Sequence, residues 1–225
     1  MVDIELYLHT LIHRLQEAFD RRLVYVGLQG SYRRGEANER SDIDCMVVLD
    51  TLTVPDMDIY REILARVGDA DRACGFLCSR EDLQNWNPCE ICQLVHETRD
   101  YYGTLRELVP AYTQADIRAY IKISVGNLYH EIVHRYIHGS AEENKRALPY
   151  SYKAVFYILQ NLYFLKTGEY ALTRAELMER LDGEDCEVLY TAALVRCQPG
   201  YDFASAFRLL LGWCQHILQV QEGII

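Results

Sequence analysis

The sequence has few basic residues, no long apolar run, and no repeat or low-complexity segment. Its 225 residues include 23 Lys and Arg against 33 Asp and Glu, which gives a formal net charge of −10. Because a surface that binds a nucleic-acid backbone is normally basic, we expect no nucleic-acid partner. No run of about eighteen apolar residues occurs, so we expect no segment that spans a membrane.

Signs of secretion are also absent. The first residues, Met-Val-Asp-Ile-Glu, are acidic and begin an amphipathic pattern, unlike the basic start of a signal peptide. In a chain without such a signal, eight cysteines indicate buried thiols rather than a disulfide framework. We therefore expect a cytoplasmic protein, and the sequence leaves open whether it forms a homo-oligomer.

The residues that most clearly indicate a binding or catalytic site lie in one polar stretch, residues 30–44, between two apolar runs. The runs, residues 23–28 and 45–49, have the branched and aromatic content of strands. Asp42 and Asp44 are two residues apart, so on a strand their carboxylates point to the same face. Adjacent carboxylates repel each other unless a cation lies between them, and hard oxygen ligands suit Mg²⁺. This pair is therefore the candidate metal site.

The start of the same stretch suits a phosphate. Gly30 and Ser31 end the first expected strand, where a residue without a Cβ lets backbone amides approach a phosphate closely. Ten residues separate Ser31 from Asp42. A Gly-Ser pair, a loop of this length and Asp-x-Asp together resemble the nucleotidyltransferase signature of the DNA polymerase β superfamily. With Arg34 and Gly35, the fuller form resembles the small-molecule branch, which includes aminoglycoside and kanamycin nucleotidyltransferases.

The resemblance implies a Mg²⁺-dependent transferase that moves a nucleoside monophosphate, AMP from ATP, onto a hydroxyl of a small molecule such as an antibiotic. The carboxylate pair would carry the catalysis, and positive side chains would contact the phosphates. The site residues so implied are catalytic and metal-binding Asp42 and Asp44, and nucleotide-binding Gly30, Ser31, Arg34 and Lys153.

The chain departs from the superfamily pattern on a later strand, where members often carry a third carboxylate. The most comparable strand here reads Ala73-Cys74-Gly75-Phe76 and offers none. Asp71, just before this strand, and Glu90, on the next expected strand, are the candidate substitutes.

Hydrophobic periodicity predicts an α+β fold with two domains, as in the kanamycin nucleotidyltransferase family. Residues 1–110 should form the catalytic domain, a mixed sheet with flanking helices, and residues 111–225 a helical bundle. The first domain should contain helices over residues 3–20 and 55–67, a helical turn over 79–83, and strands over 23–28, 45–49, 73–78 and 90–96. In the second, helices are expected over 113–138, 149–167, 174–181, 184–196 and 202–221, with a polar loop over 139–144.

A second constellation competes with this interpretation. His130-Glu131-Ile132-Val133-His134 has the H-E-x-x-H pattern of zinc metalloproteases, in which two histidines one turn apart bind Zn²⁺. His138 does not complete the extended form of that pattern, because Arg-Tyr-Ile separates it from His134. In the kanamycin nucleotidyltransferase family, a helix in the corresponding region carries a glutamate base and a lysine four residues later. That pair has no match here, but a histidine of this stripe could act as base.

Three further hypotheses stay open. Cys74, Cys78, Cys89 and Cys92 could form a four-thiolate zinc site, although buried thiols fit their apolar surroundings better. An antitoxin-type nucleotidyltransferase that acts on a protein partner is an alternative to the small-molecule enzyme. Aromatic walls for a cationic, polyhydroxylated acceptor could come from Tyr120, Tyr129, Tyr136, Tyr152 and Tyr157.

Overall fold

The computed structural model describes residues 2–198 and 200–219. The chain divides into two compact units, Met1–Ala111 and Tyr112–Ile225. The first contains a sheet with helices on both faces, and the second is helical, which confirms the predicted α+β fold class. No helix in the described part of the chain is both long and apolar enough to cross a bilayer.

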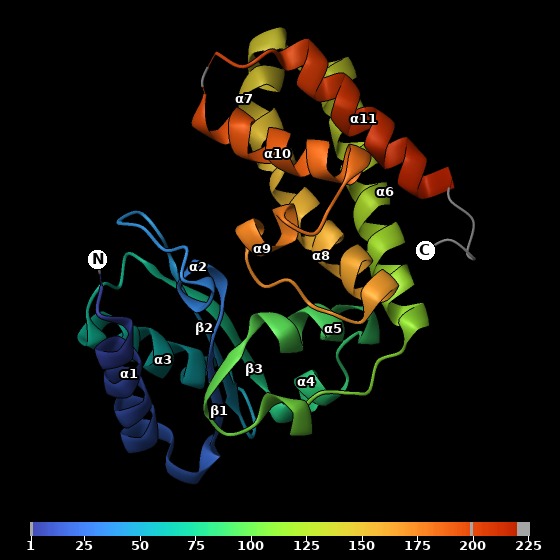
Figure 1. Ribbon diagram of the computed structural model, residues 1–225. Coiled ribbons are helices and arrows are strands. Elements are labelled where there is room, and N and C mark those ends of the chain that lie inside the picture. The colour runs from blue at the N-terminus through green and yellow to red at the C-terminus, as the bar shows by residue number, and fades with distance from the viewer. Residues whose placement is uncertain (1, 199, 220–225) are drawn as a thin grey trace. The chain divides into compact units, whose positions relative to one another are not determined.

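The first unit is built on a four-stranded mixed sheet (Figure 1). Its strands are β1 (Leu23–Leu28), β2 (Ile43–Leu49), β3 (Ala73–Ser79) and β4 (Arg99–Tyr102). The spatial order is β3-β2-β1-β4, with β1 antiparallel to β2 and β4, and β2 parallel to β3. The parallel pair requires a crossover, which α3 (Val54–Val67) supplies.

The two faces of the sheet are covered by different helices. On one face, α1 (Ile4–Phe19) and α3 pack against the apolar residues of β2 at positions 43, 45, 47 and 49. On the other face, α4 (Arg80–Gln84), α5 (Pro88–Glu97) and η2 (Leu105–Glu107) cover Met46 and Val48. Because successive side chains of a strand alternate between faces, Asp44 points to the same side as Met46, the α5 side.

The prediction of the fourth strand was wrong. Residues 90–96 belong to α5, and the fourth strand of the sheet, β4, follows at Arg99–Tyr102. The Asn87 side chain caps this helix by accepting a hydrogen bond from the Cys89 amide at 3.2 Å, and Pro88 occupies its first turn. A short apolar run is ambiguous between strand and helix, and here the cap and the proline decide for the helix.

The second unit is a helical bundle in which α8 is buried on most sides and the longest helix buries one apolar stripe. In the long helix α6, buried residues recur every three or four positions: Ile117, Ile121, Val125, Leu128 and Ile132. The helices are α6 (Gln114–His138), α7 (Ala141–Ser151), α8 (Lys153–Thr167), α9 (Arg174–Met178), α10 (Gly183–Cys197) and α11 (Phe203–Gln219). The predicted end of the last helix, at residues 220–221, lies outside the described residues.

Two predictions in this unit need correction. The expected polar loop over residues 139–144 is mostly the first turn of α7, because Ser140 and Glu143 form a capping box. Pro149 lies inside α7 rather than in the first turn of the next helix. Proline leaves the carbonyl four residues earlier without its helical donor. That carbonyl, of Lys145, accepts a hydrogen bond from the Tyr201 hydroxyl at 2.5 Å, which compensates for the proline.

The junction between η1 (Asp20–Arg22) and α3 generates a stability prediction. Arg22 donates two hydrogen bonds of 2.9 Å to the buried carboxylate of Asp56, which also caps α3 through Thr53. The hydrogen bonds from Arg22 hold the pKa of Asp56 well below its usual range. A carboxyl with a lowered pKa stabilises the fold above about pH 4, and this contribution is lost as the pH falls further.

We therefore expect Asp56→Asn to lower the melting temperature at pH 7 by several degrees and to flatten its decline below pH 4. Thermal unfolding of both proteins between pH 2.5 and 7 measures this. Asp58→Asn, at an exposed position of the same helix, is the control and should follow the wild type. Parallel curves for wild type and Asp56→Asn would contradict the role given to this carboxylate.

Candidate active site

The site is formed where β1 ends and β2 begins. Antiparallel pairing places Leu28 opposite Cys45, and the Gln29 amide donates to the Asp44 carbonyl at 2.8 Å. The chain then turns directly into a short helix, α2 (Gly30–Arg34), at a place where the sequence predicted only a loop. The two ends of the sequence motif are therefore neighbours in space, although ten residues separate Ser31 from Asp42.

Gly30 lies against the carboxylate of Asp44. Its φ is +67°, and a Cβ built on it would lie 1.9 Å from Asp44 Oδ2 and 2.8 Å from Cγ. Both the backbone conformation and the close approach therefore require glycine. Ser31 follows in the same helix and is partly exposed. The structure thus brings together the Gly-Ser pair and the second acid, as the motif predicts.

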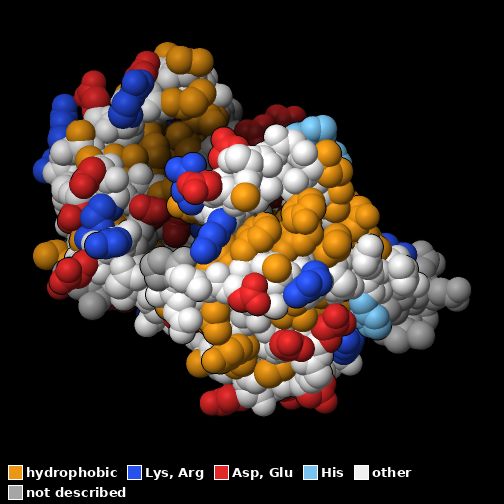
Figure 2. Space-filling view, turned by 90° about the horizontal axis from the view of Figure 1, so that it is seen from above, with side chains coloured by type: hydrophobic (Ala, Val, Ile, Leu, Met, Phe, Trp, Pro, Cys, Tyr) orange, Lys and Arg blue, Asp and Glu red, His pale blue; other side chains and the backbone are white. Residues whose placement is uncertain are grey.

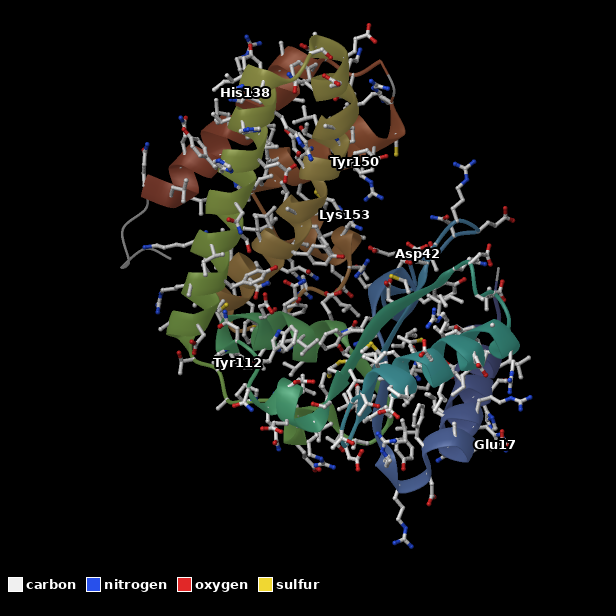
Figure 3. All side chains as sticks on the ribbon, turned by 180° about the vertical axis from the view of Figure 1, so that it is seen from behind. Glu17, Asp42, Tyr112, His138, Tyr150 and Lys153 are labelled. Carbon is white, nitrogen blue, oxygen red and sulfur yellow. The ribbon has the colours of Figure 1, made fainter. Side chains whose placement is uncertain are left out.

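The two acids differ in exposure. Asp42 precedes β2 and is exposed, and Figure 3 shows it at the end of the strand. Asp44 lies within β2 and is half-buried, whereas Ile43 between them is fully buried on the opposite face. The alternation within the strand therefore places Asp44 on the α5 side of the sheet, and Asp42 lies just before the strand begins.

A thiol lies beside this pair. The parallel register of β2 and β3 sets Cys74 opposite Asp44, and the thiol forms a hydrogen bond with the Asp44 carboxylate. Partial burial, followed by the charge of Asp44, raises the pKa of Cys74, so the thiol is a neutral donor at pH 7. The place next to the acidic pair on the neighbouring strand is therefore held by sulfur rather than by a third carboxylate.

The two candidate substitutes for a third acid lie on other elements. Asp71 is exposed in the turn between α3 and β3. Glu90 is on α5 and accepts a hydrogen bond from the Trp86 indole at 2.5 Å. Sequence reasoning placed Glu90 on a strand of the sheet, and its position on a helix removes the reason for that candidacy.

Arg34 is engaged in a buried ion-pair network. Its guanidinium donates to Glu97 at 2.8 Å and to Glu36 at 2.9 Å, and the side chains of Arg34 and Glu97 are each only 8% exposed. Next to it, the side-chain amide of Gln29 donates a hydrogen bond to the Thr98 hydroxyl at 2.8 Å. These contacts fasten α2 to the C-terminal end of α5, so Arg34 positions the motif helix.

Arg72 is a second positioning residue, and sequence reasoning missed it. Its Nε and Nη2 donate to the Ser41 carbonyl at 3.1 and 2.8 Å, and Nη2 also donates to the Tyr32 hydroxyl at 2.8 Å. The arginine thereby ties α2 to the segment that carries Asp42. No local motif marks it, because its partners lie 31 and 40 residues away along the chain.

The remaining predicted contact, Lys153, belongs to the second unit. It begins α8, where its side chain is exposed, and it is labelled in Figure 3. Its assignment to the nucleotide site stays a prediction.

The H-E-x-x-H segment does not gather a metal site. His130, His134 and His138 lie along the exposed side of α6, with ring centroids 5.8 and 4.6 Å apart, and histidines are visible on the surface in Figure 2. Glu131 accepts a hydrogen bond from Ser151 at 2.7 Å and pairs with Arg135 at 3.0 Å. Throughout residues 2–198 and 200–219, no three His, Cys, Asp or Glu side chains cluster as metal ligands.

The cysteines and tyrosines proposed as ligands or as acceptor walls differ in burial. All eight cysteines are thiols, and Cys78, Cys89 and Cys92 are buried whereas Cys74 is exposed, so the four do not assemble a zinc knuckle. Tyr152 is fully buried and donates to the Ala206 carbonyl at 2.8 Å, which makes it a core residue rather than an acceptor wall. Tyr136 is exposed and stacks on Phe207 at 4.5 Å between ring centroids.

Comparisons with known proteins agree with this geometry. Residues 9–72, which include both parts of the motif, match the family model of the nucleotidyltransferase domain. No curated protein matches the chain. A solved structure of spectinomycin adenyltransferase AAD(9) from Enterococcus faecalis, with ATP and spectinomycin, has a similar fold, with a TM-score of 0.59 at 14% identity. The alignment covers 95% of this chain and 98% of that one.

Two toxin–antitoxin structures match more weakly. One contains AMP-PNP and the other is a mutant of MntA–HpeT, and they are 24% and 25% identical to this chain. They cover 57% and 56% of this chain, and 92% and 90% of their own, with TM-scores of 0.31 and 0.29. Scores this low support no conclusion about a shared fold.

The buried network generates a prediction. Glu97→Leu should lower the free energy of unfolding by about 3 kcal/mol, near the lower end for breaking a buried ion pair, because Glu36 still pairs with Arg34. Glu36→Gln, at a more exposed partner, should cost about 1 kcal/mol or less. Urea denaturation of the three proteins measures both values. Equal losses for the two variants would show that Glu97 is not the main anchor of α2.

Proposed function

Because this chain carries a nucleotidyltransferase domain over residues 9–72 and is a nucleotidyltransferase enzyme, as its sequence predicted, we propose that it transfers AMP from ATP to a hydroxyl of a small molecule. The observation that carries the proposal is the close approach of Gly30 to the Asp44 carboxylate. It joins a phosphate-binding turn and a carboxylate pair in one site, which is what transfer of a phosphoryl-linked group requires.

The residues present fit Mg²⁺. Asp42 and Asp44 would hold the ion with two hard oxygen donors, and no third acid, histidine or cysteine joins them as a ready ligand in the described part of the chain. Mg²⁺ in proteins is usually coordinated by one or two carboxylates and completes its coordination sphere with substrate phosphates and water, so two acids suffice. When bound, the ion would neutralise charge on the triphosphate and on the pyrophosphate that leaves.

The side chains of this chain have separate tasks in the proposed reaction. Gly30 leaves room for the Asp44 carboxylate beside the turn, and Ser31 offers a hydroxyl in the first turn of α2. The acceptor hydroxyl would lose its proton to water as its oxygen bonds to the α-phosphorus, while the bond from the α-phosphorus to the bridging oxygen breaks and pyrophosphate leaves. Arg34 and Arg72 hold α2 and the segment before β2 at a fixed distance during this exchange.

A small hydroxylated acceptor is supported by two observations. The fold shared with AAD(9), which was solved with ATP and spectinomycin, extends over both units of the chain. The net charge of −10 favours a cationic partner over an anionic one. We therefore place an aminoglycoside-like or other polyhydroxylated antibiotic first among the acceptors to test. The likeness to toxin–antitoxin structures is too weak to favour a protein acceptor, which stays the alternative.

The proposal predicts that Asp42→Asn and Asp44→Asn each lower Mg²⁺-dependent transfer by about 100-fold or more, because each removes a ligand of the metal. Pyrophosphate release from ATP, with hydroxylated antibiotics and nucleosides as acceptors, measures this. Melting temperatures should hold or rise, since one of two repelling charges is gone. Asp58→Asn, on the helix that covers the opposite face, is the control.

Several outcomes would contradict the proposal. Full activity in both acid variants would remove the role of the pair. Binding of ATP without pyrophosphate release for any acceptor would indicate a nucleotide sensor or a protein-modifying enzyme instead.

Cys74 allows a test by gain of function. Cys74→Asp would add a carboxylate opposite Asp44 on the adjacent strand, so the Mg²⁺ concentration for half-maximal activity should fall severalfold. Without metal, the added charge should lower the melting temperature, and Mg²⁺ should restore it. Cys74→Ser, which adds no charge, should leave both values near those of the wild type. An unchanged Mg²⁺ requirement in Cys74→Asp would show that position 74 does not face the metal.

A further inference from the structure

We propose that Arg33, and not its neighbour Arg34, is the arginine of α2 that contacts the triphosphate. This assignment rests on the nucleotidyl transfer proposed above and names a further binding residue of the same site. Sequence reasoning chose Arg34 because of its place in the motif. The contacts of the two side chains point to the other residue.

The Arg34 guanidinium is engaged in contacts within the protein. Its guanidinium bonds Glu97 and Glu36 at 2.8 and 2.9 Å, and it is almost completely buried. Swinging it toward a nucleotide would leave the buried carboxylate of Glu97 without its main partner, which is strongly unfavourable. Arg34 therefore acts on the nucleotide only indirectly, by holding α2 in place.

The Arg72 guanidinium is also engaged in contacts within the protein. Its side chain makes three hydrogen bonds, two to the Ser41 carbonyl and one to the Tyr32 hydroxyl. Its guanidinium also lies 6.0 Å from the centre of the Tyr32 ring. Moving it would release the segment that carries Asp42, so this cation is also structural.

Arg33 differs from both. Its Nε is buried without a hydrogen-bond partner, and within the described residues its side chain makes no ion pair. Buried donors without a partner are rare in folded proteins, and a binding role is one of the few explanations for them. A guanidinium offers five donors in a planar fork that suits phosphate oxygens.

The position of Arg33 on α2 directs it to the site. Residues three apart on a helix share a face, so Arg33 lies one turn from Gly30. Long side chains on a helix lean toward its N-terminal end and cover the residue three or four positions earlier. This rule directs the Arg33 side chain toward Gly30, which lies against the Asp44 carboxylate. A triphosphate bound over the acidic pair would meet this guanidinium.

Equilibrium binding of ATP with Mg²⁺ tests the assignment, with inorganic triphosphate as competitor and the melting temperature as a second readout. Arg33→Gln should weaken the binding of both ligands by about 10- to 100-fold, the loss expected for charged hydrogen bonds, without lowering the melting temperature. Arg33→Lys should recover part of the affinity. Arg34→Gln should lower the melting temperature. Arg21→Gln removes the same charge at the far end of β1 and should bind as the wild type does.

The outcomes separate this assignment from the function on which it rests. Wild-type affinity for ATP and triphosphate in Arg33→Gln would overturn the role of Arg33 and leave the proposed function standing. Loss of triphosphate binding in Arg34→Gln at an unchanged melting temperature would overturn it as well. A wild-type protein that binds neither ligand would overturn the proposed function itself.

Discussion

The backbone of Gly30 lies so close to the Asp44 carboxylate that a Cβ would overlap its Oδ2 atom. Every other feature of the site depends on this approach. The antiparallel pairing of β1 and β2 brings residue 29 to the Asp44 carbonyl, and the positive φ of Gly30 then turns the chain into α2. A side chain at position 30 would either displace the acid or unwind the turn. The motif is therefore one packed unit rather than two functional groups joined by a loop.

The sheet fixes the direction in which the acids point. β2 alternates strictly, with Ile43, Cys45 and Val47 packed against α1 and α3, and with Asp44 and Met46 on the other side. A register slip of one residue would turn Asp44 toward α1 and α3 and bury its charge in their apolar core, which is strongly unfavourable. The hydrophobic core thus selects the same face for the carboxylates that the chemistry requires. One alternating pattern in β2 therefore provides both the buried core and the direction of the acid.

Sequence reasoning succeeded where a signal is local. The period of two placed Asp44 on the face opposite Ile43, and the apolar runs gave β1, β2 and β3. It failed over residues 90–96, since a short apolar run fits a strand or a buried helix equally well. The partners of Arg34 and Arg72 were also out of reach: Glu97 lies 63 residues beyond Arg34, and only the folded sheet brings them together. Two polar residues that pair across a long stretch of sequence leave no periodic pattern from which the pair could be predicted.

The structure separates the support of the site from its reacting face. Arg34 and Glu97, which hold α2, are nearly completely buried, whereas Asp42 and Cys74 are exposed. A buried ion pair resists screening and rearrangement, so the support keeps its geometry whether or not a ligand is present. The exposed carboxylate of Asp42 stays hydrated, which avoids the cost of burying an unpaired charge. The fold therefore holds the motif in place without a ligand, so the binding energy of the proposed nucleotide would not be spent on assembling it.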